Sequence, residues 1–155
     1  MCLHSPLPIT KQVKEQKIWY KHLRLIDGSY TTPYWGGTPM HIGHRYTRNQ
    51  LEARTPDGHR LVPKGVRLLY DDFIGQDTVD SKNYYYPGIH CYQSIPHFVQ
   101  KLWHGRERLV EVRVGQIMAY GFEKYGNTDE VTGVFRSVTL LRDVTELVKT
   151  GKLTG

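Results

Sequence analysis

The sequence predicts a strand-rich α+β domain: a mainly antiparallel, curved sheet or half-barrel with one main packed helix and a short C-terminal helix. Three observations predict this class. Segments of alternating apolar and polar residues dominate the chain, one segment has a clear helical period, and strands do not alternate regularly with helices as in a parallel sheet. The 155 residues also include 11 Tyr and 3 Trp, and tyrosine suits half-buried strand surfaces.

Length and composition indicate one domain. With 39% hydrophobic and 23% charged residues, the chain has ordinary globular usage and is long enough for a continuous core. Residues 1–16 carry prolines and mixed charges without apolar periodicity, so we expect an N-terminal arm there. The domain then covers residues 17–150, and residues 151–155 form a tail.

The first half of the chain contains one clear strand. Residues 17–26 are aromatic and β-branched, and the pair Asp27-Gly28 ends the strand in a turn. A loop with two prolines leads to residues 41–53, whose second half is either a short helix or an edge strand. Residues 65–75 add another apolar stretch.

The second half contains the main helix and most of the strands. A short buried strand, IHCY, precedes a helix expected over about 94–104, with Ser94 as its N-cap and Gly105 as its stop. Strands follow at 109–115, at 117–130 together with a turn, and as one longer alternating run at 131–144.

The charge favours an anionic partner. A net charge of +6 and a pI of about 9.3 attract nucleotides, nucleic acids or acidic proteins. The two cysteines, Cys2 and Cys91, form neither a disulfide framework nor a zinc pattern, which favours the cytoplasm. No apolar run has the length of a membrane span, and no secretory signal is evident, so we expect no membrane partner. The histidines and Cys91 do not fall at zinc-ligand spacings, so we expect no metal, and we also expect no cofactor.

The order of the segments resembles a family of small, largely uncharacterised domains in phages and bacteria, sometimes found beside pentapeptide repeats. The first strand at 17–25 belongs to this pattern, and five motifs complete it: HIGHRY at 41–46, GIHCYQS at 88–94, LVEVRVG at 109–115, AYG at 119–121 and VFRSVTLLRDV at 134–144. The resemblance implies a phage-type accessory protein in the host cytoplasm, acting against host defence or host enzymes.

A cleft for a phosphate-bearing ligand is the leading functional hypothesis. We expect the loop at 34–46 and the segment at 84–90 to form it, because basic side chains among aromatic ones suit phosphate clamping and base stacking. The ligand would be a nucleotide, a cyclic nucleotide or a short nucleic acid. The predicted ligand-binding residues are Tyr34, Trp35, Arg45, Tyr46, Tyr86 and Arg136.

An enzyme using the same cleft is the first alternative. His41, His44 and His90 would act as acid and base on a phosphodiester, because histidine titrates near neutrality. Residues 39–44 resemble the signature of class I nucleotidyl transferases, and GIHCY resembles a strand of ADP-ribosyltransferases, with Glu123 or Glu130 as the acidic residue. Each histidine also has a structural interpretation, as a hydrogen-bonded core or loop residue.

A protein-binding or structural role in a phage particle or a host-enzyme complex is the second alternative.

Overall fold

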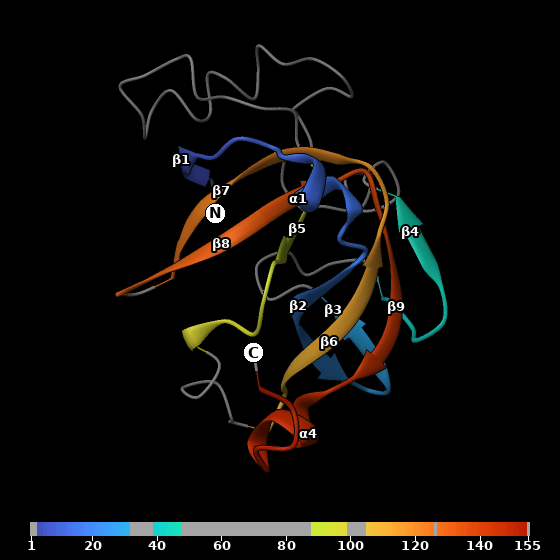
Figure 1. Cartoon of the computed structure of the whole chain (residues 1–155). Coiled ribbons are helices and arrows are strands. Elements are labelled where there is room, and N and C mark those ends of the chain that lie inside the picture. The colour runs from blue at the N-terminus through green and yellow to red at the C-terminus, as the bar shows by residue number, and fades with distance from the viewer. Residues whose placement is uncertain (1–2, 32–38, 48–87, 99–104, 126, 155) are drawn as a thin grey trace, which may run out of the picture.

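The computed structural model describes residues 3–31, 39–47, 88–98, 105–125 and 127–154. In these residues, nine strands form one open antiparallel sheet, and two short helices accompany it (Figure 1). Strand-rich α+β architecture with a short C-terminal helix, as predicted, is confirmed. The elements are β1 (Leu3–Pro6), α1 (Lys11–Glu15), β2 (Ile18–Ile26), β3 (Ser29–Thr31), β4 (Arg45–Thr47), β5 (Ile89–Tyr92), β6 (Glu107–Val114), β7 (Ile117–Tyr125), β8 (Thr128–Phe135), β9 (Ser137–Asp143) and α4 (Thr145–Lys149).

The strand order places the two halves of the sheet far apart. It runs β1-β7-β8-β5-β2-β6-β9-β4, and β3 pairs with β2 off this path. The hairpin of β7 and β8 therefore lies on one side of the molecule and β4 on the other (Figure 1). Three strands, β2, β6 and β9, separate β5 from β4.

One long, bent ribbon forms much of the sheet. β6 continues into β7 and β8 continues into β9, while β6 pairs with β9 and β7 with β8. At the bend, the Gly115 N–H donates to the Ser137 carbonyl (2.9 Å), and the Arg136 N–H donates to the Gln116 carbonyl (3.0 Å). Strands β5 and β2 fill the space between the two arms of this ribbon, because β5 pairs with β8 and β2 pairs with β6.

The bend corrects one prediction. The sequence predicts a single strand over residues 131–144, whereas β8 ends at Phe135 and β9 begins at Ser137. Apolar and polar residues alternate on both sides of Arg136, so the sequence pattern contains no break. The change of neighbouring strands, from β5 and β7 to β6 and β4, sets the boundary instead.

Strand β2 is central, and its turn is as predicted. β2 pairs with β6 over seven consecutive residues. Asp27 (φ 51°) and Gly28 (φ 82°) then form a two-residue hairpin turn into β3, as Asp-Gly favours when both central residues need positive φ.

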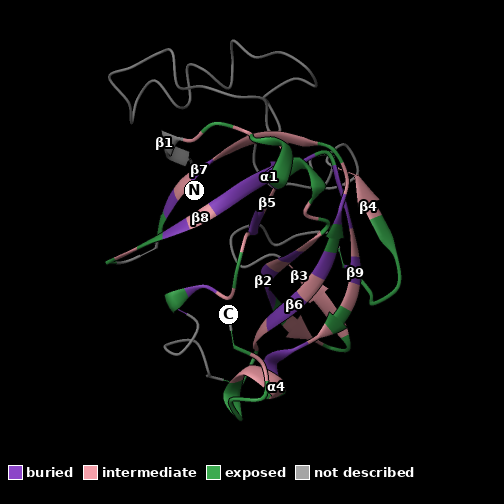
Figure 2. Ribbon diagram, viewed as in Figure 1, coloured by how far each residue is buried: buried purple, intermediate pink, exposed green. Residues whose placement is uncertain are grey.

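The main core lies on one face of the sheet. Trp19 and Leu23 from β2 are fully buried there together with Phe135, whose ring centroid lies 4.8 Å from that of Trp19 in an edge-to-face contact. Buried residues run along the inner strands, whereas much of α1 and α4 is exposed (Figure 2). Gly133 is required in this core, because a Cβ atom there would lie 2.7 Å from the Phe135 ring.

The segment expected as an N-terminal arm is folded over residues 3–16. β1 pairs with β7 at one edge of the sheet, and α1 buries Val13 in the main core. The Thr10 hydroxyl caps α1 by accepting a hydrogen bond from the Val13 N–H (3.3 Å).

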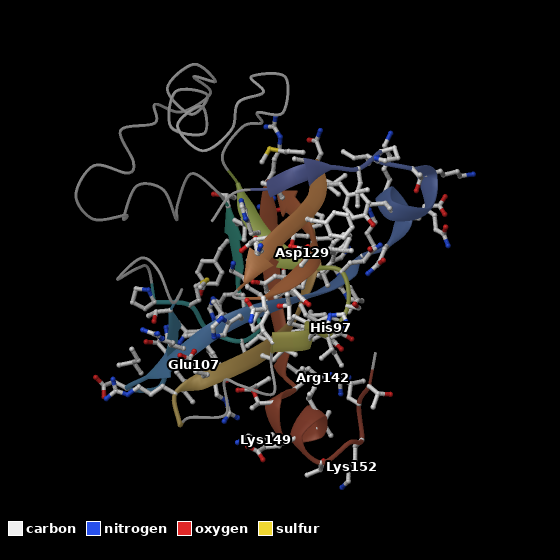
Figure 3. The ribbon with its side chains drawn as sticks, turned by 90° about the vertical axis from the view of Figure 1, so that its left-hand side faces the viewer. His97, Glu107, Asp129, Arg142, Lys149 and Lys152 are labelled. Atoms are coloured by element: carbon white, nitrogen blue, oxygen red, sulfur yellow. The ribbon has the colours of Figure 1, made fainter. Side chains whose placement is uncertain are left out.

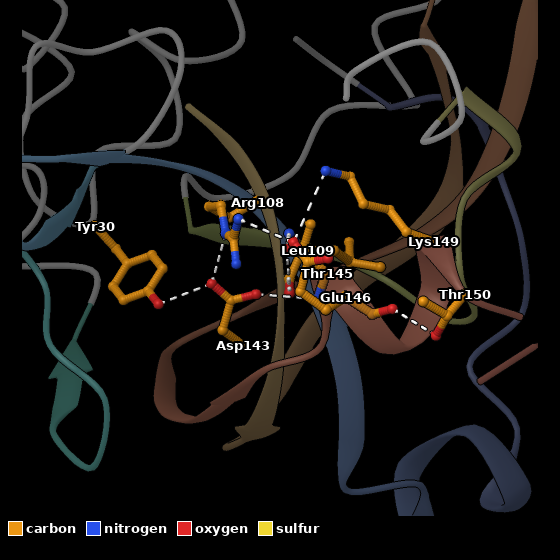
Figure 4. Close-up of polar contacts among 8 residues, drawn as sticks. All are labelled: Tyr30, Arg108, Leu109, Asp143, Thr145, Glu146, Lys149 and Thr150. Atoms are coloured by element: carbon orange, nitrogen blue, oxygen red, sulfur yellow. Dashed lines mark hydrogen bonds and ion pairs between the residues drawn. The ribbon is translucent and has the colours of Figure 1, made fainter. Parts of the chain in front are cut away.

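A polar network fixes the C-terminal helix to the sheet (Figure 4). The Asp143 carboxylate accepts hydrogen bonds from the Tyr30 hydroxyl (2.8 Å), Arg108 Nε (2.8 Å) and the Thr145 N–H (3.0 Å). The buried Thr145 hydroxyl accepts from the Leu109 N–H (2.9 Å). Since α4 has only five residues, these contacts hold it in place rather than its own helix propensity.

The main packed helix predicted over about 94–104 is not supported. Residues 94–96 are not helical, His97 and Phe98 form a short 3₁₀ turn, and 99–104 lie outside the described residues. The Gln93 N–H still bonds to the Val131 carbonyl of β8 (3.0 Å), so the chain follows the sheet beyond the end of β5. Phe98 is nevertheless buried, as expected of the apolar face, and its ring packs on Tyr92.

The remaining predictions divide between described and undescribed residues. The short buried strand IHCY is β5, and the strand and turn expected over 117–130 are β7 and the start of β8. In the segment 41–53, residues 45–47 form the edge strand β4, and residues from 48 onward, including the stretch at 65–75, lie outside the described residues. The described part of the chain has no helix both long and apolar enough to cross a membrane.

Candidate functional site: an arginine row and three histidine–glutamate pairs

His41 and His44 lie together on an exposed turn before β4. Their ring centroids are 6.1 Å apart. Gly43 (φ 89°) allows the turn, and its N–H donates to the Leu140 carbonyl of β9 (2.7 Å). The Tyr46 hydroxyl accepts a hydrogen bond from the His41 N–H (2.8 Å). The two imidazoles thus project from a turn that the sheet holds in place.

Arg45 begins a cross-strand row on the face of the sheet opposite the main core. Its register partner on β9 is Thr139, and the partner of Thr139 on β6 is Arg113. Directly opposite residues project from the same face of a sheet, and the residues that alternate with this row, Val112, Val138 and Leu140, are in the core. Both arginines are exposed. We call Arg45, Thr139 and Arg113 the arginine row.

The arginine row carries uncompensated positive charge within the described part of the chain. There, neither Arg45 nor Arg113 pairs with a carboxylate. The acidic residue two positions from Arg113 on the same face of β6 is Glu111, which Arg142 Nε already engages at 3.2 Å. Two exposed guanidinium groups on either side of a threonine hydroxyl therefore form a site that can accept an anion.

Tyr46 and Arg136 differ in their surroundings. The ring of Tyr46 packs against the main core, so Tyr46 supports the histidine turn through its hydroxyl. Arg136 is exposed at the bend between β8 and β9, one residue before Ser137, the register partner of Thr47.

His90 lies in the other half of the sheet, paired with a buried carboxylate. Its Nδ1 is 3.0 Å from Glu123 Oε2, and the Glu123 side chain is 4% exposed. Burial by itself would raise the pKa of Glu123, but its hydrogen bond and charge interaction with His90, together with the Lys21 ammonium, lower that pKa overall. Lys21 Nζ also donates to the His90 carbonyl (2.9 Å).

A second histidine–glutamate pair lies beside the first. His97 Nδ1 is 2.7 Å from Glu130 Oε1, and the Glu130 carboxylate also accepts the His97 backbone N–H (2.8 Å). Glu130 is directly opposite Glu123 in the register of β8 and β7, so their side chains leave the sheet on the same face. In Figure 3, His97 lies beside the part of β8 that carries Asp129, the residue before Glu130.

A third pair joins β2 to β6. His22 Nε2 lies 2.6 Å from Glu107 Oε2, and Arg24 Nε donates to Glu107 Oε1 (3.0 Å). Burial lowers the pKa of His22 although Glu107 opposes this change. The imidazoles differ in exposure: the side chains of His22, His90 and His97 are 6%, 20% and 82% exposed. Of the three, His97 therefore presents its ring most fully to solvent.

The structure brings some predicted site residues together and separates others. His41, His44, Arg45 and Tyr46 form one group at the β4 edge. His90 lies on β5, four strand positions away, which is roughly 19 Å along the sheet at about 4.8 Å per strand. Tyr34, Trp35 and Tyr86 lie outside the described residues, as does most of the predicted cleft.

Sequence reasoning missed two groups of residues. Arg113 and Thr139 belong to ordinary alternating strands, and only the strand register shows that they flank each other. The sequence pattern places His97 in a helix, and its partner Glu130 is 33 residues away in sequence, with no local spacing to reveal it. In the described residues, no group of three or more His, Cys, Asp or Glu side chains could hold a metal ion.

Comparisons of the chain with protein-family models, with curated proteins and with solved structures found no match.

Proposed function

We propose that the protein is a binding module for a phosphate-bearing ligand: a nucleotide, a cyclic nucleotide or a short nucleic acid. The observation that carries the proposal is the arginine row, in which Arg45 and Arg113 flank Thr139 on an exposed face. The net charge of +6 adds a long-range attraction for anions.

The dimensions of the row suit a phosphate group. Arg45 and Arg113 are two strand positions apart, which places their Cα atoms about 10 Å from each other. Arginine side chains can converge from that distance on one phosphate, where guanidinium groups donate in pairs and the threonine hydroxyl donates from below. A bound anion also relieves the repulsion between the two guanidinium groups.

The exposed histidines and aromatic residues extend the proposal. His41 and His44 lie on the turn that directly precedes Arg45. They would contact the sugar or the base of a nucleotide whose phosphate is bound by the arginine row. Tyr34, Trp35 and Tyr86 remain the proposed stacking residues of the cleft. A phage-type role against host defence, by sequestration of such a ligand, remains part of the proposal through the family resemblance.

Binding is tested with a nucleotide panel and a labelled oligonucleotide. Mono-, di- and cyclic nucleotides are screened by thermal shift, since a ligand that binds the folded state raises the melting temperature. A fluorescein-labelled 12-nucleotide single strand is then titrated by anisotropy with wild type, Arg45→Gln and Arg113→Gln. We expect each substitution to weaken binding about 10-fold or more, because a hydrogen bond to a charged group contributes about 1.5–3 kcal/mol.

A matched control separates the arginine row from general charge. Lys152→Gln removes the same charge from an exposed residue near the C-terminus and should leave the dissociation constant within a factor of about 2, as expected for a distant screened charge. The salt dependence of binding by Arg113→Gln should also be shallower by about 0.7 in log–log slope for each phosphate that the arginine no longer neutralises. If Arg113→Gln and Lys152→Gln bind alike, or no ligand in the panel binds, the proposal is wrong.

A further inference from the structure

Strands β2 and β6 carry four residues of complementary chemistry on the face of the sheet that also carries the arginine row. Ile18 is directly opposite Arg113, and Tyr20 is directly opposite Glu111. Directly opposite residues project from the same face, and this face is the one opposite the main core, because Trp19, between Ile18 and Tyr20, is a core residue. We call Arg113, Ile18, Glu111 and Tyr20 the quartet.

Tyr20 offers part of an aromatic ring and a hydroxyl group on this face. The ring packs against a small apolar cluster of Leu109 and Val144, and the residue stays partly exposed. Within the part of the chain that the structure describes, the Tyr20 hydroxyl makes no hydrogen bond. Burial raises the pKa of Tyr20, and the Glu111 carboxylate raises it further, although Arg142 opposes this change. The hydroxyl therefore keeps its proton near pH 7 and can donate it to a ligand.

The Glu111 carboxylate keeps acceptor positions for a ligand. Arg142 donates to Glu111 Oε1 from Nε (3.2 Å) and to Oε2 from Nη2 (3.2 Å). A carboxylate has about four acceptor positions, so about two remain. The Arg142 guanidinium thus orients the carboxylate and compensates its charge, and the Glu111 side chain is still 15% exposed.

The spacing within the quartet fits one nucleotide. Arg113 and Tyr20 are diagonal neighbours across the two strands, and such neighbours lie about 7–8 Å apart. One ribose separates the phosphate of a nucleotide from its base, so a phosphate bound by the arginine row can bring the base over Tyr20. Ile18, partly exposed beside Tyr20, can contact the apolar side of the sugar.

We propose that the quartet binds the base of the ligand: the base stacks on the Tyr20 ring, and an amino group of the base donates to the Glu111 carboxylate. This inference rests on the proposed binding of phosphate by the arginine row. In a strand, the nucleoside on the other side of that phosphate is the one that would meet His41 and His44.

The chemistry of Glu111 narrows the ligand to nucleotides or single strands whose bases carry an exocyclic amino group, which are adenine, cytosine and guanine. A carboxylate accepts from the cytosine amino group, whereas thymine and uracil present a carbonyl oxygen at the same position. That oxygen would lie against the Glu111 carboxylate without a hydrogen, so these bases should bind less tightly.

Cytidine and uridine strands test the role of Glu111, because position 4 of the base carries an amino group in one and a carbonyl oxygen in the other. Fluorescein-labelled 12-nucleotide RNAs of each base are titrated by anisotropy. Wild type should bind the cytidine strand at least about 5-fold more tightly, as expected for one good base contact. Glu111→Gln should reduce this ratio below about 2, because an amide can pair with either group. Glu15→Gln removes the same charge from an exposed pair on α1 and should leave the ratio unchanged.

Two substitutions test the stacking on Tyr20. Tyr20→Leu should weaken binding of the cytidine strand about 10-fold or more, which is the usual effect of losing a base–aromatic contact. Tyr20→Phe keeps the ring and should bind within about 3-fold of wild type. Leucine can retain apolar packing on Leu109, and the melting temperature of each variant shows whether it is folded. If Tyr20→Leu does not fold, the strand ratio of Glu111→Gln still decides the proposal.

An abasic strand separates this inference from the proposed function, because it has the same phosphates and no bases. Wild type should bind an abasic 12-nucleotide strand at least about 10-fold more weakly than the cytidine strand. Equal binding of the abasic and cytidine strands, equal binding of the cytidine and uridine strands, or unchanged binding by folded Tyr20→Leu would each overturn the inference. The arginine row would remain the phosphate site in those cases if Arg113→Gln still weakens binding. Failure of wild type to bind any of the strands would overturn both.

Discussion

Removal of the Asp143 carboxylate tests the network that joins α4 to the sheet. Asp143 accepts three hydrogen bonds, from Tyr30, Arg108 and Thr145, at 2.8–3.0 Å. At about 1 kcal/mol net for each bond, Asp143→Ala should lower the free energy of unfolding by about 3 kcal/mol. Asp143→Asn, which keeps the shape and loses the charge, should lower it by about half as much.

The pH dependence gives the sign of the effect. Burial alone would raise the pKa of Asp143, but the hydrogen bonds from Arg108, Thr145 and Tyr30 lower it below its ordinary value of 3.8. A carboxyl with a lowered pKa in the folded state stabilises the fold fully above the unfolded pKa, and this contribution disappears as the pH falls through the folded pKa. The difference between wild type and Asp143→Asn should therefore be constant from pH 7 to about 5 and shrink towards pH 2.

Urea unfolding followed by tryptophan fluorescence measures these differences. Glu15→Gln is the control, because the pair of Lys11 and Glu15 is exposed and contributes at most about 0.5 kcal/mol. A double-mutant cycle with Tyr30→Phe should show coupling of about 1 kcal/mol between Tyr30 and Asp143. A decrease below about 1 kcal/mol for Asp143→Ala would refute the reasoning, since an acceptor of three hydrogen bonds cannot then be important to the fold.

Two further predictions concern the main core. Gly133→Ala should destabilise the fold by about 2 kcal/mol, because the added Cβ would meet the Phe135 ring at 2.7 Å and Trp19 at 3.0 Å. Thermal unfolding measures the change. A melting temperature equal to that of wild type would show that the two rings move aside freely. Burial raises the pKa of the Cys91 thiol to about 12, so in a Cys2→Ser background iodoacetamide at pH 8 should label Cys91 in urea but hardly at all in the folded state. Intact-mass spectrometry measures the labelling. Rapid labelling of Cys91 without urea would contradict its complete burial.

Much of the fold could be predicted from the sequence because alternation reports on strands directly. β6 coincides with a segment whose apolar residues alternate, and β2, β5 and β7 coincide with apolar, aromatic-rich segments predicted as strands. The Asp27-Gly28 turn follows from the positive φ that both positions need. The break at Arg136 had no such signal, because it depends on which strands lie alongside.

The helix prediction failed for a related reason. The apolar spacing after Ser94 fits a helix, but the Glu130 carboxylate, 33 residues away, takes the His97 N–H. An acceptor supplied by another strand fixes the backbone at His97 in a way that local sequence does not specify.

The candidate sites show the same limit. The cluster of His41, His44 and Arg45 could be predicted, because these residues are neighbours in sequence. The arginine row and the pairing of Glu123 with Glu130 could not, because both depend on strand register across the sheet. Register is fixed by the burial pattern of whole strands and not by the polar residues themselves.

Residue-resolved NMR is the most direct test of the central claim that the arginine row binds a phosphate-bearing ligand. Backbone amide spectra of ¹⁵N-labelled protein would be recorded during titration with the best ligand of the nucleotide panel. The proposal predicts that the largest shifts occur at Arg45, Thr139 and Arg113, and that Arg113→Gln needs about 10-fold more ligand, or still more, for the same shifts. Shifts confined to the far side of the sheet, around β7 and β8, would contradict it.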